Sequence, residues 1–292
     1  MSKQYGGEIT DAQKESLKKI GKYIIIIFLV LLVIWLIYLT WYQYRNRKNN
    51  EPMLIKSPFN ATKKFVHEST NLPSNRSGNE YGYSFWIYLN DWNYRFDQPK
   101  SVLWRGDASC NVANPSIWLH PRENKLMVRC DSYSYDANTG QFSNSSGSMN
   151  PLVNPSILDD GKSCDIDNIP LQRWVHVGVS LWNRTLDVYI NGKLTRSCVL
   201  DGVAKLNNGN IYTTGAGGFQ GYISRLQYFN HALAPEKIYK IYRKGPFPAN
   251  WWWESAKHTL PTIKCSARID EPSGEEKNYS FTANKQSNWV NM

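Results

Sequence analysis

The sequence has little hydrophobic character outside one short stretch. Its mean hydropathy is −0.51 over 292 residues, which excludes a transporter with many membrane spans. It also lacks the alternating carboxylates of a glycosidase strand, the G-x-S-x-G and H-E-x-x-H motifs, and the Walker A phosphate loop. These absences leave no catalytic residues to assign, and we predict a protein that is not an enzyme.

Cysteine and histidine are scarce, and neither shows the spacing of a metal site. There are five of each, and the cysteines contain no C-x-x-C pair. Because five is odd, at least one cysteine is unpaired or bonds outside the chain. Two disulfides suit a lumenal domain, and five thiols suit a cytosolic one. We expect no cofactor, and Ca²⁺ is the one metal for which the sequence offers candidate ligands.

The net charge of +10 is not spread evenly. The first 66 residues carry +7, whereas the remaining 226 residues hold 23 basic and 20 acidic side chains. A nucleic-acid-binding domain carries its basic excess on the folded part. The distribution therefore argues against nucleic acid as a partner of the large C-terminal part. It leaves that option open only for the N-terminal tail, residues 1–22.

Residues 24–42 form one long apolar run, IIIIFLVLLVIWLIYLTWY. Its 19 residues include no charge, glycine or proline. As a helix the run would be about 28 Å long, close to the hydrocarbon thickness of a bilayer. A cleaved signal peptide has a shorter apolar region and small residues at its cleavage site. We therefore predict one transmembrane helix over residues 23–44.

Side chains in and beside the run fit a membrane anchor with aromatic and basic ends. The anchor candidates are Ile24, Phe28, Leu32, Trp35, Tyr38, Trp41 and Tyr42. The cations expected to meet lipid headgroups are Lys18, Lys19, Lys22, Arg45, Arg47 and Lys48. Five Lys or Arg precede the run and four follow it, within about 20 residues of its ends. This balance does not decide the orientation of the chain in the membrane.

Three further segments follow the apolar run. Residues 45–62, rich in Asn, Pro and Lys, are expected to form a stalk that lifts the next domain off the bilayer. Residues 63–245 form the large domain, and residues 246–292 form a C-terminal extension. In the extension, three adjacent tryptophans either pack on the domain or contact a partner, since tryptophan is enriched at interface hot spots. These are Trp251, Trp252 and Trp253.

The large domain shows the periodicity of β-strands. Residues 82–89, 173–183 and 185–190 alternate apolar and polar side chains with a period of two. Asn191-Gly192 is the sequence of a type I′ hairpin turn. Shorter strands are expected at residues 101–105, 116–120, 125–130 and 193–199. Many short strands with frequent turns predict an all-β domain.

Two local irregularities and one long loop complete the pattern. Residues 221–229 break the period by one residue, which predicts a β-bulge. Residues 234–245 predict a short helix with Pro235 in its first turn and Gly245 at its end. Residues 131–172 are rich in Asn, Ser, Asp and Gly, and we expect them to form a loop. The predicted fold is a two-sheet antiparallel jelly-roll sandwich with a short C-terminal helix, preceded by the transmembrane helix.

Four aspartates cluster in this loop, namely Asp159, Asp160, Asp165 and Asp167. Ca²⁺ binds six to eight oxygens, and the cluster offers some of them. The spacing of an EF-hand is absent. A Ca²⁺ site at the rim of the domain and a solvated acidic loop both remain open.

Three segments together resemble the laminin-G/concanavalin A-like family. They are YSFWI at residues 83–87, WVHV running to YINGK at residues 174–193, and GYISRL followed by NHAL and Glu236 at residues 221–236. Ser224 departs from the pattern, because the family often has Asp at that position. The resemblance implies two curved antiparallel sheets forming a binding or structural module for carbohydrate or protein, in some members through Ca²⁺.

The order of one N-terminal span and then such a domain, in a chain rich in Asn, Tyr and Lys, resembles membrane proteins of large icosahedral DNA viruses. That resemblance implies a single-pass minor capsid protein of the host-derived virion inner membrane. Its large domain would face the capsid, and its partners would be the lipid bilayer and other capsid proteins. The alternative is a lectin-like receptor or adhesin on a cell or virion surface. Trp86, Trp118 and Trp182 would either stack on its carbohydrate or pack in the core, and core packing is the favoured role.

Overall fold

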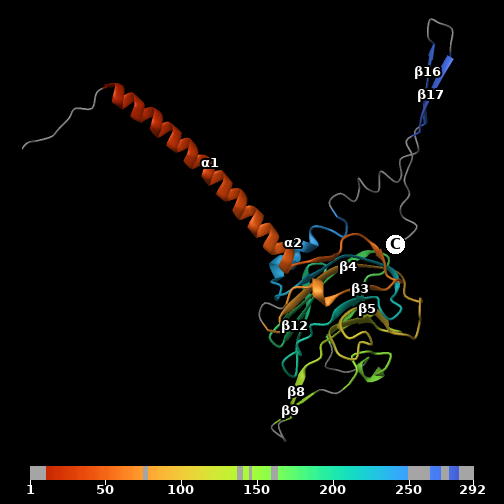
Figure 1. Cartoon of the computed structure of the whole chain (residues 1–292). Coiled ribbons are helices and arrows are strands. Elements are labelled where there is room, and N and C mark those ends of the chain that lie inside the picture. The colour runs from red at the N-terminus through yellow and green to blue at the C-terminus, as the bar shows by residue number, and fades with distance from the viewer. Residues whose placement is uncertain are drawn as a thin grey trace, which may run out of the picture.

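The computed structural model describes residues 11–74, 78–136, 141–144, 147–158, 164–248, 264–270 and 276–282 (Figure 1). A long helix leads into two antiparallel β-sheets that pack face to face. A short helix follows the last strand of the sandwich. This arrangement confirms the predicted jelly-roll sandwich.

Helix α1 (Asp11–Asn50) contains the apolar run. Its segment Lys18–Asn46 is long and apolar enough to cross a membrane, and none of its apolar window is buried in the fold. A helix that is apolar on every side is stable only in nonpolar surroundings. By length and composition, α1 therefore suits a membrane span or a signal sequence.

The first sheet has the strand order β1-β15-β4-β11-β12-β13, with β2 also paired to β15. Its strands are β1 (Met53–Ile55), β2 (Phe59–Asn60), β4 (Tyr81–Asp91), β11 (Trp174–Trp182), β12 (Thr185–Ile190), β13 (Lys193–Val199) and β15 (Gln220–Phe229). Asn191 and Gly192 join β12 to β13 with φ of 50° and 78°, which confirms the predicted hairpin turn. The predicted bulge is also confirmed, because the register of β15 shifts between Ser224 and Gln227.

The second sheet has the order β10-β7-β6-β5-β14-β3. Its strands are β3 (Phe65–His67), β5 (Lys100–Gly106), β6 (Ala113–Leu119), β7 (Lys125–Arg129), β10 (Cys164–Asp167) and β14 (Asn210–Thr213). The remaining elements are 3-10 helices η1 (Ser69–Asn71) and η2 (Pro155–Ile157) and the hairpins β8 (Tyr133–Asp136) with β9 (Gln141–Asn144) and β16 (Lys264–Asp270) with β17 (Glu276–Thr282).

The described parts of residues 131–172 thus contain more regular structure than the expected loop. They contain η2, the β8–β9 hairpin and β10, which is an edge strand of the second sheet. The sequence of β10 is Cys-Asp-Ile-Asp, and Cys164 and Ile166 are buried in the core. The strand was not predicted because alternation of buried and exposed side chains over only four residues is hard to recognise within a polar segment.

The core lies between the two sheets, because alternate side chains of each strand point inward. Phe85 and Ile87 on β4 meet residues such as Ile117 on β6 within one buried cluster. Cys164 on β10 and Cys198 on β13 form a disulfide between edge strands of the two sheets. Two further cysteines, Cys110 and Cys130, are free thiols.

Residues 45–62 differ from the expected stalk. Helix α1 continues to Asn50, two residues connect it to β1, and β1 pairs with β15. Ile55 is 6% exposed and belongs to the core. The sandwich therefore begins inside the segment expected to hold it away from the membrane. The apolar triplet at residues 53–55 is a strand. It was not predicted because the Asn, Pro and Lys residues around it are typical of a loop.

Candidate functional site at the junction of helix and sandwich

Helix α2 (Pro235–Tyr242) packs on the outer face of the first sheet. Pro235 stands in its first turn and Gly245 follows its end with φ of 71°, as predicted. The apolar contact joins Leu233, Ile238 and Ile241 to Tyr189 and Phe229 of the sheet. A Cβ on Gly82 would lie 2.5 Å from Leu233 Cγ, and one on Gly178 would lie 3.2 Å from Ile238 Cγ2. The glycines in these strands therefore allow the helix to approach closely.

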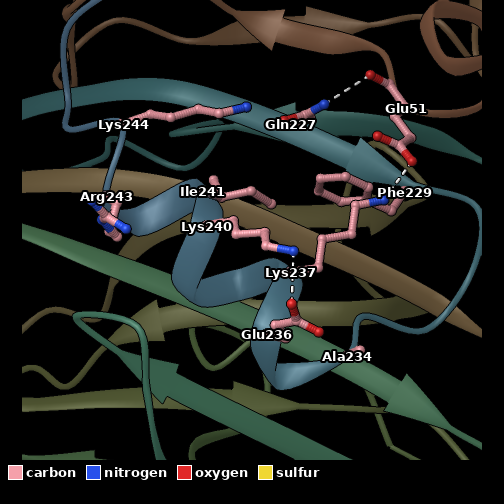
Figure 2. A pocket seen from close by; sticks show the side chains of 10 residues that line it. All are labelled: Glu51, Gln227, Phe229, Ala234, Glu236, Lys237, Lys240, Ile241, Arg243 and Lys244. Carbon is pink, nitrogen blue, oxygen red and sulfur yellow. Dashed lines mark hydrogen bonds and ion pairs between the residues drawn. The ribbon is translucent and has the colours of Figure 1, made fainter.

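The end of α1 is fastened to β15 and α2 (Figure 2). Gln227 Nε2 donates a hydrogen bond to the Glu51 carbonyl oxygen at 3.0 Å. The backbone nitrogen of Tyr228 donates to the Pro52 carbonyl oxygen at 3.1 Å. Lys237 Nζ forms an ion pair with Glu51 Oε1. Backbone and side-chain bonds thus hold both residues of the connection against the sandwich.

A hollow of about 700 Å³ opens where these elements meet (Figure 2). It is lined by Glu51, Gln227, Phe229, Ala234, Glu236, Lys237, Lys240, Ile241, Arg243 and Lys244. Four of these side chains are cations and two are carboxylates. Lys237 pairs with Glu51, and Lys240 with Glu236 at 2.7 Å. The hollow therefore carries a net positive charge.

A second hollow of about 400 Å³ adjoins the first at Lys244. It is lined by Met53, Lys56, Arg225, Lys244 and Pro248. Arg225 Nη1 donates to the Phe247 carbonyl oxygen at 2.9 Å, which holds the chain after α2 against β15. The exposed cations around the two hollows are Lys56, Lys240, Arg243 and Lys244. We call these four residues the basic rim.

A buried polar pair lies beneath α2. His176 Nε2 is 2.9 Å from Ser84 Oγ, and the histidine ring contacts the rings of Trp86 and Tyr242. Burial, with a smaller effect of the Arg225 charge, lowers the pKa of His176 to about 3. The imidazole is therefore neutral at pH 7 and supports the packing of α2.

Comparison with protein families identifies the sandwich. Residues 66–239 match the family described as the concanavalin A-like lectin/glucanases superfamily. The chain belongs to this family. The match confirms the resemblance seen in the three sequence segments. Comparison with curated proteins found no match.

Solved structures that resemble the chain include domains of botulinum neurotoxins. The serotype D binding domain is 17% identical, covering 67% of this chain and 43% of that chain with a TM-score of 0.41. The serotype D ligand binding domain in complex with N-acetylneuraminic acid is 12% identical, covering 68% and 52% with a TM-score of 0.41. The type G receptor binding domain is 13% identical, covering 64% and 46% with a TM-score of 0.37. The chain thus matches about half of each, and likeness at this level supports no argument about ligands.

In this concanavalin A-like chain, the predicted anchor residues all lie along α1 with exposed side chains: Ile24, Phe28, Leu32, Trp35, Tyr38, Trp41 and Tyr42. The predicted flanking cations Lys18, Lys19 and Lys22 are exposed just before the N-terminal end of the apolar run. Arg45 Cζ lies 5.2 Å from the centroid of the Trp41 ring, a cation–π contact. Arg47 and Lys48 belong to α1, and only their backbone is described.

The predicted Ca²⁺ ligands do not come together in the described part of the chain. Asp165 forms an ion pair with the buried Arg129, and Asp167 lies 3.9 Å from Lys125 Nζ. The other two candidates, Asp159 and Asp160, lie outside the described residues. Among the described residues, no group of three His, Cys, Asp or Glu side chains is placed to hold a metal ion.

The aromatic candidates separate by exposure. Trp118 is completely buried and Trp86 is 5% exposed, so neither ring is open to a sugar. Trp182, at the end of β11, is 65% exposed. The partner candidates Trp251, Trp252 and Trp253 lie outside the described residues. The basic rim is a candidate site that no sequence motif indicated.

Proposed function

We propose that the chain is a non-enzymatic, membrane-anchored binding protein whose concanavalin A-like domain sits directly on the end of its membrane helix. The observation that carries this proposal is the continuity of α1. An apolar, unburied helix continues to Asn50, and the next two residues are already bonded to the sandwich. A signal sequence has no such tie to the mature fold.

Within this function we favour a structural role, that of a minor capsid protein that tethers the inner membrane of a large DNA virus to its protein shell. The binding fold, the absence of catalytic motifs and the short connection to the helix support a tether. The second candidate is a lectin-like receptor. Only the exposed ring of Trp182, with its capacity to stack on a sugar, favours it.

Anchorage is tested by alkaline carbonate extraction of membranes that contain the full chain. The wild type is expected to stay in the membrane pellet. Leu31→Arg together with Leu32→Arg is expected to release it, because charges at the bilayer centre are costly. The matched control places the same arginines at Gln13 and Ser16, outside the apolar run, and is expected to stay in the pellet. Release of the wild type would overturn the anchorage.

The structural role is tested on purified particles. A tether is expected at fixed copy number beneath the shell, and chemical crosslinking should join the sandwich to shell proteins. Selective binding to a glycan array that is lost in Trp182→Ala, with no such crosslinks, would favour the receptor instead.

A further inference from the structure

The basic rim lies on the side of the sandwich that α1 enters. Figure 1 shows α2 beside the end of α1, and one hollow is lined by both Glu51 and Lys244. The second hollow extends this surface along β1 to Lys56. The cations of the rim are therefore grouped around the base of the helix.

The connection is short enough to keep this surface near the lipid. Asn50 is eight residues beyond Tyr42, where the apolar run ends. Eight helical residues extend about 12 Å, and the headgroup region on each side of a bilayer is about 5–8 Å deep. The junction thus stands about 4–7 Å outside the headgroups, within the Debye length of about 8 Å at physiological salt.

The rim cations are not needed to balance charge within the fold. Lys240 pairs with Glu236, but both side chains are exposed, and such pairs contribute little to stability. Arg243, Lys244 and Lys56 have no carboxylate partner among the described residues. Proximity to the C-terminus of α2 accounts for basic residues there. It does not account for Lys56, which follows β1.

We propose that the basic rim and its two hollows bind the phosphate groups of anionic phospholipids in the membrane that α1 crosses. This inference rests on the proposed anchorage. A second attachment beside the helix would stop the sandwich from turning about the helix axis. Anionic lipid is expected to strengthen the contact about fivefold for each cation that reaches it.

The test uses the full chain in nanodiscs of phosphatidylcholine with or without phosphatidylserine. Reductive methylation followed by mass spectrometry measures the accessibility of each lysine. Methylation of Lys56, Lys240 and Lys244 is expected to slow at least about fivefold in the anionic discs. Lys64, which is exposed beside Tyr212 of the second sheet, should react equally in both. Equal rates at the rim lysines in the two discs would overturn the proposal.

Two variants and one added anion sharpen the result. Arg243→Gln with Lys244→Gln should remove the protection of Lys56, whereas the matched pair Lys63→Gln with Lys64→Gln should keep it. Protection by inorganic phosphate in neutral discs, without any from phosphatidylserine, would assign the site to a soluble phosphate and overturn the lipid contact.

Carbonate extraction of membranes that contain the full chain separates the lipid contact from the anchorage. A chain that stays in the bilayer without protection at the rim overturns the lipid contact alone. A chain that is extracted overturns both the contact and the anchorage.

Discussion

The two outer faces of the sandwich are covered in different ways. On the second sheet, Trp104 stacks on Trp118 and Tyr212. Met149 and Leu158, from the segment 147–158, pack against this cluster. On the first sheet, α2 covers the centre and leaves the two hollows at its margin. The segment 147–158 thus packs on the outer face of the second sheet, whereas the outer face of the first sheet has two hollows beside the end of α1.

Charge follows the same division. Beneath the segment that covers the second sheet, the buried Arg129 donates from Nε and Nη2 to the Ile157 carbonyl oxygen at 2.9 Å and 2.7 Å and pairs with Asp165. Around α2, the rim cations point to solvent. The buried pair holds the segment that contains Ile157 in place. Among the rim cations, only Lys240 pairs with a carboxylate in the described residues, and that pair with Glu236 is exposed.

The largest expected effect comes from the closed face. Arg129→Met should lower the free energy of unfolding by about 3–5 kcal/mol, because Asp165 would keep a nearly buried charge with no partner. Urea unfolding of the full chain in detergent, followed by tryptophan fluorescence, measures this loss. Adding Asp165→Leu should restore most of the stability. A loss under about 1 kcal/mol would show that the pair is not what holds the segment.

An intermediate effect is expected beneath α2 and depends on pH. The pKa of His176 is about 3 in the folded state and about 6.5 in an unfolded chain. The unfolded state therefore binds more protons between these values, so stability is full above about pH 6.5 and falls as the pH drops. The wild type should lose up to about 1.4 kcal/mol per pH unit relative to His176→Gln. Parallel pH profiles of unfolding free energy would contradict this reading.

The smallest effect is expected at the basic rim. Arg243→Gln and Lys244→Gln should each change the free energy of unfolding by less than about 0.5 kcal/mol, since both are exposed and unpaired within the described residues. The same urea titration measures it. A loss comparable to that of Arg129→Met would mean that the rim serves the fold, and the contrast between the faces would disappear.

The sandwich could be predicted because its main signals are local. Alternation along residues 82–89 and 173–183, the turn at Asn191 and Gly192, and the bulge in residues 221–229 each depend on neighbours in the chain. The family resemblance then implied that these strands form two curved antiparallel sheets, and the order of the strands comes from the structure. Here local periodicity and the tertiary fold agree.

The basic rim could not be predicted as one surface, because Lys56 is distant in sequence from Lys240, Arg243 and Lys244. Lys56 and Lys244 meet only when β1 pairs with β15 and the chain returns after α2. Basic and acidic side chains are nearly balanced over residues 67–292. A count along the sequence therefore does not show that Lys240, Arg243 and Lys244 gather beside the end of α1. The expected stalk failed for a related reason, since Ile55 shows its role only once β15 is beside it.

The connection between helix and sandwich also has a mechanical consequence. It consists of Glu51 and Pro52, and proline restricts both its own φ and the conformation of the residue before it. Because this connection is short and hydrogen-bonded to the sandwich, we expect the helix and the domain to move together. A transmembrane helix tilts by about 20° on average, and more when its apolar length exceeds the bilayer thickness. If α1 spans a membrane as proposed, the thickness of that membrane would change the direction in which the far end of the sandwich points.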